Sequence, residues 1–373
     1  MEIHIVGSGR SGKAALDLAQ KEGYSSRLYE TDADLDESFC DILVVSPGIP
    51  LSKESIQKKK RRGAEVIGEV EFASRHSSHS MIGVTGTNGK TTAVNQIAKT
   101  LTAHGREAVA CGNNGYPLSE AILTEDEETM LVVELSSYQL ETLITPCLDV
   151  ALILNIAPDH LNRYADFTEY ANTKCRIKWA LKKNGVLFVD QNTLEQFGDE
   201  LNIPQRVRFV SSAVSDVVSH VLGKEVEIIE SRLPHRLEYI AEGVINDSKA
   251  TNVAAVVHAL QSMKGSVVLI LGGQRKGEPF TPILEFDDKI ERCIIFGADA
   301  QSIAQELSPP LQVEVVKTVE ESVQKGIETV TKKAEILFSP GCASFDTHQN
   351  YEKRGEAFKD AIYALKGIVH EQA

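Results

Sequence analysis

Residues 81–92, MIGVTGTNGKTT, are the stretch around which the rest of the sequence is organised. Apolar residues 81–85 predict the end of a strand, residues 93–103 predict a helix, and a glycine-rich turn joins the two. Such a turn points successive backbone N–H groups and the positive end of a helix at one spot, which suits a polyphosphate. Lys90 adds a mobile cation, and the hydroxyl of Thr91 adds a magnesium ligand. We therefore predict that ATP phosphates are bound by Gly86, Thr87, Asn88, Gly89, Lys90, Thr91 and Thr92.

The spacing of this turn departs from the usual phosphate-binding pattern G-x-x-x-x-G-K-[ST]. Val84 occupies the position of the first glycine, and Gly86 supplies that glycine instead, so the loop is the shorter G-x-x-G-K-T. A strand–turn–helix corner that simply needs glycines is the alternative interpretation. We favour ATP binding, because G-K-T directly follows a predicted strand and turn.

Composition restricts the function classes. The chain has 373 residues, enough for two or three domains, and its 42% hydrophobic and 25% charged residues are typical of a globular protein. A net charge of −14 argues against a nucleic-acid-binding surface. Six cysteines lie far apart with no C-x-x-C pair, which predicts reduced thiols and no zinc site. The basic run Lys58–Arg62 directly precedes Gly63 and so predicts the end of a helix rather than a nuclear signal.

The sequence contains no evident targeting segment. Met1–Val6 leads directly into a strand pattern, without the cationic stretch and apolar core of a signal peptide. No apolar run approaches the length that a membrane span needs. We therefore expect a cytoplasmic protein, a monomer, with no membrane insertion and no nucleic-acid partner.

The first segment, residues 1–70, alternates strands and helices and contains a second glycine-rich turn. Residues 7–12, GSGRSG, match the dinucleotide fingerprint G-x-G-x-x-G, and the acidic Glu30 ends the next predicted strand. Taken alone, this pattern is compatible with a nicotinamide-dependent oxidoreductase. The segment has only about half the length of a two-lobed dinucleotide fold, so a single nucleotide diphosphate fits better. A glycine corner that packs helix on strand remains the structural alternative.

The central segment contributes three further candidate residues. Glu134 ends a buried strand, in a position where a carboxylate holds magnesium in many ATP-binding folds. His160 follows another buried strand at the same presumed sheet edge, and we favour a functional role for it over a structural one. Lys174 lies on a predicted helix, where a lysine is usually solvated, so residue patterns alone do not single it out.

The third segment continues the alternation of strands and helices. Residues 237–240 and 243–245 predict a hairpin, and three later strands alternate with helices. We therefore predict an α/β protein of three doubly wound domains, with a Rossmann-like first domain, a central domain of the P-loop ATPase type and a Rossmann-like third domain. Their expected bounds are 1–70, 71–232 and 233–373.

Nine segments occur in the order typical of one family, the Mur ligases, and most resemble its D-glutamate-adding branch. The DNPR-type motif of the branches that add diaminopimelate or lysine is absent, which supports D-glutamate as the acceptor. The matching segments are SPGIP (46–50), GVTGTNGKTT (83–92), GNNG (112–115), ELSSYQLET (134–142), N-x-x-x-DHL (155–161), LPHRLE (233–238), INDSKATN (245–252), LGG-x-x-KG (271–277) and FSPGCASFD (338–346).

The resemblance implies ATP-dependent amide formation through an acyl phosphate, with UDP-N-acetylmuramoyl-L-alanine and D-glutamate as substrates in peptidoglycan precursor synthesis. It implies two magnesium ions on Thr91, Glu134, His160 and a carbamylated Lys174, with Lys90, Glu134, His160 and Lys174 as the catalytic set. The implied UDP-sugar site comprises Arg10, Ser11, Gly12, Glu30, Thr31, Gly48, Asn113 and His160. Further ATP contacts are expected from Arg236, Asn246, Asp247 and Lys249, and D-glutamate contacts from Thr251, Lys276, Ser344 and Phe345.

One departure from the family pattern concerns adenine. The family's central domain usually ends in an extra helix that carries adenine-binding asparagines, but no asparagine occurs here between Asn202 and Asn246. Two alternatives to D-glutamate ligation therefore stay open within the resemblance. One is a Mur-type ligase with another acceptor, and the other is a non-catalytic relative that binds a UDP-sugar.

Overall fold

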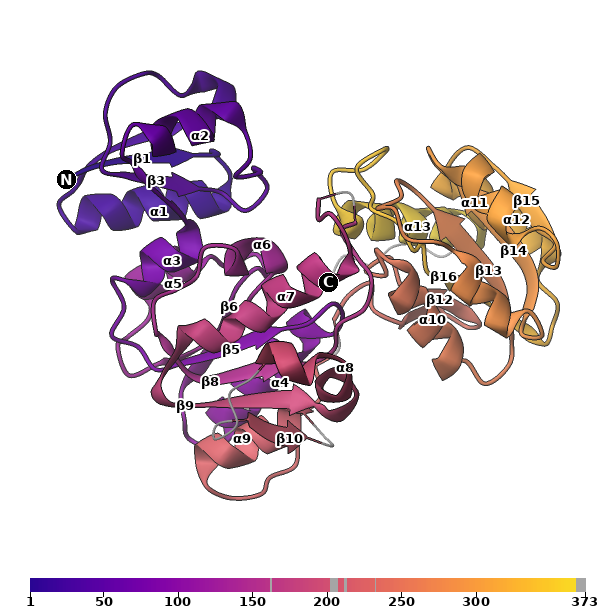
Figure 1. Cartoon of the computed structure of the whole chain (residues 1–373). Coiled ribbons are helices and arrows are strands. Elements are labelled where there is room, and N and C mark those ends of the chain that lie inside the picture. Colours follow the sequence, from indigo (N-terminus) through magenta and orange to yellow (C-terminus); the bar gives the residue numbers. More distant parts are fainter. Residues whose placement is uncertain (162, 202–206, 211–212, 232, 367–373) are drawn as a thin grey trace. The chain divides into compact units, whose positions relative to one another are not determined.

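The computed structural model describes residues 1–161, 163–201, 207–210, 213–231 and 233–366 (Figure 1). The chain forms two compact units: Met1–Ile156 with Thr168–Ser231, and Ala157–Phe167 with Arg232–Ala373. Three sheets with helices between their strands make up the described part, which confirms the predicted α/β class. Among the described helices, none combines the length and the apolar character needed to cross a bilayer.

The first sheet has four parallel strands in the order β2-β1-β3-β4. Its inner strands consist mainly of buried aliphatic residues, as expected for strands covered on both faces. The basic run ends a helix as predicted, since α2 stops at Arg61 and Gly63 follows with φ 99°. The elements are β1 (Glu2–Val6), α1 (Arg10–Lys21), β2 (Ser25–Tyr29), η1 (Asp32–Asp34), β3 (Ile42–Val45), α2 (Glu54–Arg61), β4 (Glu65–Gly68) and α3 (Glu69–Ser74).

The central sheet has six parallel strands in the order β10-β9-β8-β5-β7-β6. Strand β5, which precedes the phosphate loop, therefore lies between β8 and β7. The strands are β5 (Met81–Thr85), β6 (Ala108–Gly112), β7 (Met130–Glu134), β8 (Leu148–Ile153), β9 (Leu181–Asp190) and β10 (Val207–Val210). The helices are α4 (Lys90–Ala103), α5 (Leu118–Thr124), α6 (Ser137–Leu140), α7 (Phe167–Cys175), η2 (Arg176–Ala180), α8 (Gln191–Leu201) and α9 (Ala213–Leu222).

The alternating apolar residues at 225–229 predict a strand, and this prediction is wrong. Residues 225–229 form no strand and run along α4 instead. The Ile229 N–H donates to the Thr100 hydroxyl at 3.0 Å. Val226 and Ile228 pack against the core cluster that α4 shares with β5. The segment's alternating apolar residues are therefore buried by a helix surface, and a helix side chain takes the place of a neighbouring strand as hydrogen-bond partner.

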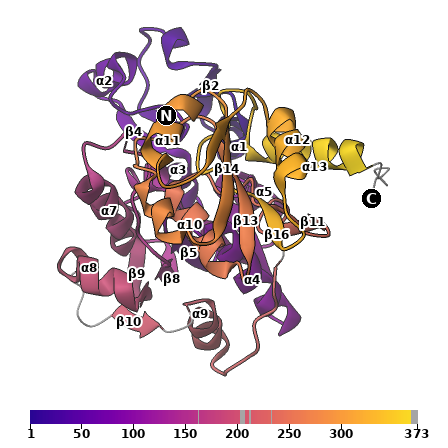
Figure 2. The ribbon, with the colours of Figure 1, turned by 90° about the vertical axis from the view of Figure 1, so that its right-hand side faces the viewer.

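The third sheet has six strands in the order β11-β12-β16-β13-β14-β15, parallel except for the predicted hairpin of β11 and β12. Alternate residues of β13 enter two different core clusters, with α10 and α11 over one face and α12 and α13 over the other (Figure 2). The elements are β11 (Glu238–Ala241), β12 (Val244–Asn246), α10 (Val253–Ser262), β13 (Ser266–Gly272), η3 (Thr281–Phe286), β14 (Ile290–Phe296), α11 (Ala300–Leu307), β15 (Val313–Val315), α12 (Val319–Thr329), β16 (Ala334–Phe338) and α13 (Tyr351–Lys366).

A fully buried arginine joins α13 to the loops at the carboxyl ends of β12 and β16. Arg354 donates to the Ser248 hydroxyl at 3.1 Å, to the Ser248 carbonyl at 2.7 Å and to the Cys342 carbonyl at 2.9 Å. These loops carry INDSKATN and FSPGCASFD, so the arginine holds two predicted substrate-binding segments together.

Replacing this arginine tests its contribution to stability. Arg354→Ala leaves three buried acceptors without a donor, so the free energy of unfolding should fall by about 3 kcal/mol or more. The neighbouring Lys353, whose ion pair with Glu356 is exposed, is the matched control, and Lys353→Ala should leave the stability close to that of the wild type. Urea unfolding of both variants measures the difference. Equal losses in the two variants would contradict a special role for Arg354.

Candidate nucleotide and acceptor sites

The phosphate loop is built by β5, four loop residues and α4, which begins at Lys90, earlier than the predicted residue 93. Gly86 and Gly89 have φ 155° and 85°, values that side-chain-bearing residues rarely adopt. A Cβ on Gly86 would also lie 3.0 Å from the Leu154 Cβ. The glycines are thus required by the backbone path of the loop.

Two lysines meet at the carbonyl of Gly86. Lys90 Nζ donates to this oxygen at 2.8 Å and to the Thr87 carbonyl at 2.9 Å. Lys174, on α7 and 1% exposed, donates to the same Gly86 oxygen at 2.8 Å. Its ammonium lies 4.8 Å from the ring centroid of Tyr170, whose hydroxyl is 3.1 Å from that of Thr87. The structure therefore brings Lys174 to the phosphate loop, a position that residue patterns alone could not indicate.

Glu134 ends β7, the strand beside β5, and pairs with Val84 in the sheet register. The residue is 3% exposed. Its Oε1 accepts a hydrogen bond from Asn113 Nδ2 at 3.0 Å, but its buried Oε2 has no hydrogen-bond partner within the described ranges. A buried carboxylate oxygen without a donor is costly, and a bound cation would offset that cost. The geometry of Glu134 therefore fits a magnesium ligand.

The described residues contain no cluster of three His, Cys, Asp or Glu side chains that could hold a metal by itself. Thr91 lies in the first turn of α4, directly after Lys90. His160 belongs to the second unit, has φ 56°, and its Nε2 lies 3.7 Å from Asp159 Oδ2. Within the first unit, the predicted metal ligands are Thr91, Glu134 and Lys174. An unmodified lysine has no carboxylate, so Lys174 could serve as a ligand only after carbamylation.

Six of the eight predicted UDP-sugar residues, all except Asn113 and His160, lie on and around the first sheet. Arg10, in the first turn of α1, forms two hydrogen bonds with Glu120 at 2.9 and 3.0 Å, and its guanidinium lies 6.0 Å from the centroid of the Tyr116 ring. Thr31 donates through its N–H and hydroxyl to Asp34 at 2.8 and 2.7 Å. Glu30 and Gly48 are exposed, and Ser11 is half-buried.

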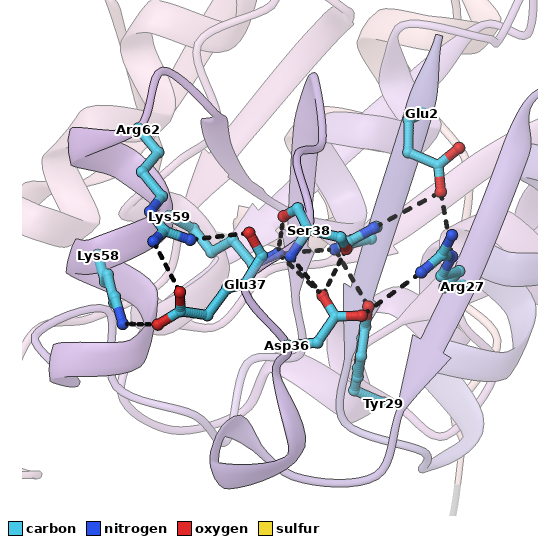
Figure 3. Close-up of polar contacts among 10 residues, drawn as sticks. Glu2, Arg27, Tyr29, Asp36, Glu37, Ser38, Lys58, Lys59 and Arg62 are labelled. Carbon is cyan, nitrogen blue, oxygen red and sulfur yellow. Dashed lines mark hydrogen bonds and ion pairs between the residues drawn. The ribbon is translucent and has the colours of Figure 1, made fainter.

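A cavity of about 240 Å³ lies beside this region, and five of its seven charged side chains pair with one another (Figure 3). Buried Lys59 donates to the Ser38 carbonyl at 2.6 Å and contacts His4 Nδ1 at 3.0 Å. Burial and Lys59 lower the pKa of His4. Lys58 and Arg62 both pair with Glu37. Internal compensation of this kind is typical of a structural network, so we assign no ligand to the cavity.

In the second unit, two predicted acceptor residues lie together. Lys276 Nζ is 3.5 Å from the Thr251 hydroxyl and forms an ion pair with Asp159 at 3.1 Å. Asn252 also donates to Asp159, at 2.9 Å. Burial opposes ionisation of Asp159, but Lys276 and His160 lower the pKa of its carboxyl to about 2. Sequence reasoning gave Asp159 no role, although it precedes His160 in the family motif.

The other acceptor candidates differ in exposure. Ser344 is buried, and its carbonyl accepts the N–H groups of Thr347 and His348. Phe345 is 72% exposed. Glu278 is a buried carboxylate close to Lys276, and neither of its oxygens has a hydrogen-bond partner in the described part of the chain. Burial raises the pKa of Glu278, and Asp159 adds to that shift.

Two of the predicted nucleotide contacts are held inside the second unit. Asn246 is fully buried and donates to the Gly355 carbonyl at 3.1 Å, while its side-chain oxygen accepts the Ser248 N–H at 3.1 Å. Asp247 accepts from the Leu237 N–H at 3.2 Å and from the Ser339 hydroxyl at 2.9 Å. These two side chains therefore shape the loop after β12.

The remaining two nucleotide-side candidates differ from this pair. Lys249 Nζ is 2.7 Å from the Tyr351 hydroxyl and 4.3 Å from the centroid of its ring. Arg236 has a buried Nε without a hydrogen-bond partner among the described residues. A buried donor of this kind calls for an acceptor, which a nucleotide oxygen could supply.

The pH dependence of stability tests the burial of Asp247. Burial raises the pKa of its carboxyl from 3.8 to about 6, although Arg236 opposes the shift. Because the folded state holds this proton more tightly, Asp247 favours folding at low pH and costs stability as pH rises through about 4 to 6. Relative to the wild type, Asp247→Asn should gain stability across this range, by at most about 3 kcal/mol.

Thermal unfolding of both proteins at several pH values measures this difference. Asp288→Asn is the control, because Asp288 is exposed and its replacement should leave the pH profile unchanged. Parallel profiles for the wild type and Asp247→Asn would show that Asp247 ionises as readily in the folded chain as in the unfolded one.

Fold and site together define a nucleotide-binding α/β protein with a lysine-bearing phosphate loop. Comparison with known families narrows this class. The model of the Mur ligase middle domain matches residues 84–258, and that of the Mur ligase glutamate ligase domain matches residues 235–342. The chain belongs to the Mur ligase family.

Curated relatives extend the match over nearly the whole chain. The UDP-N-acetylmuramoylalanine–D-glutamate ligase of Protochlamydia amoebophila is 34% identical, covering 97% of each chain. The protein of the same name from Caldanaerobacter subterraneus is also 34% identical, over 87% of this chain and 84% of its own length.

Solved structures show the same fold at low identity. The UDP-N-acetylmuramate–alanine ligase MurC of Thermotoga maritima aligns with a TM-score of 0.60 and 15% identity, covering 98% of this chain and 100% of its own. The MurF ligase of Thermotoga maritima in complex with ADP aligns with a TM-score of 0.61 and 16% identity, covering 97% and 95%.

Proposed function

We propose that this protein is an ATP-dependent ligase that joins D-glutamate to UDP-N-acetylmuramoyl-L-alanine in peptidoglycan precursor synthesis. The observation that carries the proposal is the near-full-length similarity to relatives named for this reaction, at 34% identity. The glycine turn at residues 7–12 alone suggested a nicotinamide-dependent oxidoreductase, and that hypothesis has no comparable support.

The chemistry follows from the charges of the reactants. A carboxylate is a poor acyl donor, so the alanyl carboxylate first attacks the γ-phosphorus of ATP, giving an acyl phosphate and ADP. The neutral amine of D-glutamate then attacks the acyl carbon, and inorganic phosphate leaves as the amide forms. Lys90, whose ammonium lies at the phosphate loop, would offset the negative charge that builds up during phosphoryl transfer. Lys276 and Thr251 would orient the acceptor's carboxylates.

Magnesium fits the residues around the phosphate loop. The buried Oε2 of Glu134 and the Thr91 hydroxyl are suitable oxygen donors, and the metal role of His160 stays a prediction. A bound magnesium ion would reduce the repulsion between the two anions that react. Two relatives of known structure support a nucleotide and a divalent ion, since MurF of Thermotoga maritima was solved with ADP and a Yersinia pestis folylpolyglutamate synthase with AMPPNP and manganese.

The proposed division of labour follows the three sheets. Residues 1–70 would bind the UDP part of the sugar-peptide, residues 71–232 would bind ATP, and residues 233–373 would bind the acceptor. Asn113 links two of these tasks, because its side chain donates to Glu134 and also belongs to the implied sugar-peptide site. All six cysteines are free and buried, which supports a reducing, cytoplasmic location. We also infer a monomer without a nucleic-acid partner.

An acceptor screen tests the proposal directly. Purified protein with ATP, magnesium and UDP-N-acetylmuramoyl-L-alanine should release phosphate when D-glutamate is added, and far less with L-alanine, L-lysine or diaminopimelate. Equal turnover with another amino acid would assign the chain to a different branch of the family. Binding of the UDP-sugar without any ATP turnover would identify a non-catalytic relative.

Replacing the loop lysine tests its role in the same assay. Lys90→Ala should lower kcat/KM by about 100-fold or more, because a cation aimed at the developing phosphoryl charge is lost. Lys99, exposed on the same helix and 3.3 Å from Ser231, is the matched control, and Lys99→Ala should retain wild-type turnover. Full activity of Lys90→Ala would remove the phosphate loop from the mechanism.

We further propose that Lys174 is carbamylated. Its ammonium is buried at a loop that would bind an anion and metal ions, and carbon dioxide converts a neutral lysine into a carbamate that can hold magnesium. The addition uses the neutral form of the amine and leaves a carboxylate in place of the ammonium.

Labelled bicarbonate tests the carbamate independently of turnover. The wild-type protein in ¹³C-bicarbonate should give a carbamate carbonyl signal in its NMR spectrum, and the signal should be absent from Lys174→Ala. Activity of that variant should fall by about 100-fold or more, since a metal ligand is lost. Lys178→Ala, which alters a more exposed lysine near the end of α7, should keep both signal and activity. A fully active Lys174→Ala variant would exclude the metal-ligand role.

A further inference from the structure

We propose that Asn155 is a positioning residue for ATP, because its side chain fixes the backbone of the phosphate loop. The inference rests on the proposed function, since it assumes that the loop binds ATP. It concerns a residue to which neither the loop pattern nor the implied site assigned a role. Asn155 follows β8, the strand beside β5, and is half-buried.

The parallel ladder of β5 and β8 continues beyond the ends of both strands. The regular register ends at the pair of Thr85 and Ile153. Beyond it, the Leu154 N–H donates to the Thr85 carbonyl at 3.0 Å, and the Thr87 N–H donates to the Asn155 carbonyl at 2.8 Å. The first half of the loop is therefore held as an extension of the sheet.

The side chain of Asn155 adds two further hydrogen bonds where the main chain of β8 turns away. Its Oδ1 accepts the Asn88 N–H at 2.9 Å, and its Nδ2 donates to the Asn88 carbonyl at 3.0 Å. A carboxamide provides a donor and an acceptor side by side, so it binds the N–H and the C=O of one residue in the way that a neighbouring strand would. Neither a carboxylate nor an aliphatic side chain can make both bonds.

These contacts decide where the loop can receive phosphate. The N–H groups of Thr87 and Asn88 are directed to Asn155, and the carbonyls of Gly86 and Thr87 accept from Lys90. The N–H groups directed at phosphate are then expected from the first turn of α4, where the helix dipole also favours an anion. By holding the loop backbone, Asn155 thereby positions the first turn of α4 for phosphate binding.

The short loop explains why such support is needed. The pattern G-x-x-G-K-T has two residues fewer between its glycines than G-x-x-x-x-G-K-[ST], so it has fewer backbone groups with which to close on itself. The neighbouring strand supplies the missing contacts through Asn155. The contribution of this residue should therefore appear in nucleotide affinity more than in overall stability.

Direct nucleotide binding tests this role with two variants. Asn155→Ala removes both side-chain bonds but keeps the main-chain bond, and Asn155→Asp keeps the acceptor but loses the donor and adds a negative charge beside the phosphates. The Kd for ATP with magnesium, measured by calorimetry on the full chain, should rise at least about tenfold in both variants. The increase should be larger for Asn155→Asp. Asn192→Asp, an exposed asparagine at the start of α8, is the charge-matched control and should bind ATP like the wild type.

The other substrate and the thermal midpoint separate positioning from a general structural role. Affinity for UDP-N-acetylmuramoyl-L-alanine should change less than about twofold, and the Tm without ligand should stay close to that of the wild type. Wild-type affinity for ATP in both Asn155 variants would overturn the inference. So would an equal loss of affinity for both substrates together with a lowered Tm. If the wild type itself binds no ATP, the proposed function fails instead.

Discussion

The backbone carbonyl of Gly86 is the point on which the candidate site depends. Lys90, from the helix that follows the loop, and Lys174, from a helix much later in the chain, both donate to this one oxygen. The direction of the carbonyl is set by the backbone of a residue with φ 155° and little room for a Cβ. A side chain at this position would turn the peptide, and both lysines would lose their common acceptor. Gly86 therefore does more than keep the loop free of a side chain, because its carbonyl also holds the ammonium groups of Lys90 and Lys174.

Strand order brings the other groups to the same loop. Because β5 lies between β8 and β7, the residues that follow or end these neighbours flank the loop on its two sides. β8 contributes Asn155 and β7 contributes Glu134. In sheets of parallel strands, ligands bind at the carboxyl ends of the strands. Asn155 and Glu134 therefore reach the same loop directly from the two strands beside β5. The two residues are 21 positions apart in the sequence but only two strands apart in the sheet.

Local chemistry made part of this site predictable. The turn glycines, the lysine at the end of the loop and a buried strand that ends in a carboxylate can all be recognised in the sequence. They allowed the phosphate loop and Glu134 to be predicted. The approach of Lys174 depends on how α7 packs, which no local pattern encodes. Residues 225–229 have a strand-like alternation, yet they pack on α4, because a helix surface can also bury alternate residues. Tertiary contacts decided both cases.

Motif residues that look equivalent in the sequence have different surroundings in the structure. In INDSKATN, Asn246 and Asp247 are buried in hydrogen bonds within their own unit, whereas Lys276 and Thr251 form a cluster that includes a buried acidic partner, Asp159. The first pair maintains the loop after β12. The second group has polar atoms that a dicarboxylate could meet. A family motif therefore combines residues that stabilise a loop with residues whose polar groups are available to a ligand.

The three glycines of the fingerprint at residues 7–12 also differ in their surroundings, and this difference weakens the case for a dinucleotide. A Cβ on Gly12 would lie 1.8 Å from the Gly7 carbonyl oxygen, and a Cβ on Gly7 would lie 2.5 Å from the Ser46 hydroxyl. Gly12 is thus required by the close approach of α1 to the preceding turn, and Gly7 by the close approach of the Ser46 side chain, whatever ligand is bound. Only Gly9 has open space around it, so it alone among the three is compatible with close approach of a ligand to the backbone. Two of the three glycines that suggested a nicotinamide cofactor therefore carry no information about the ligand.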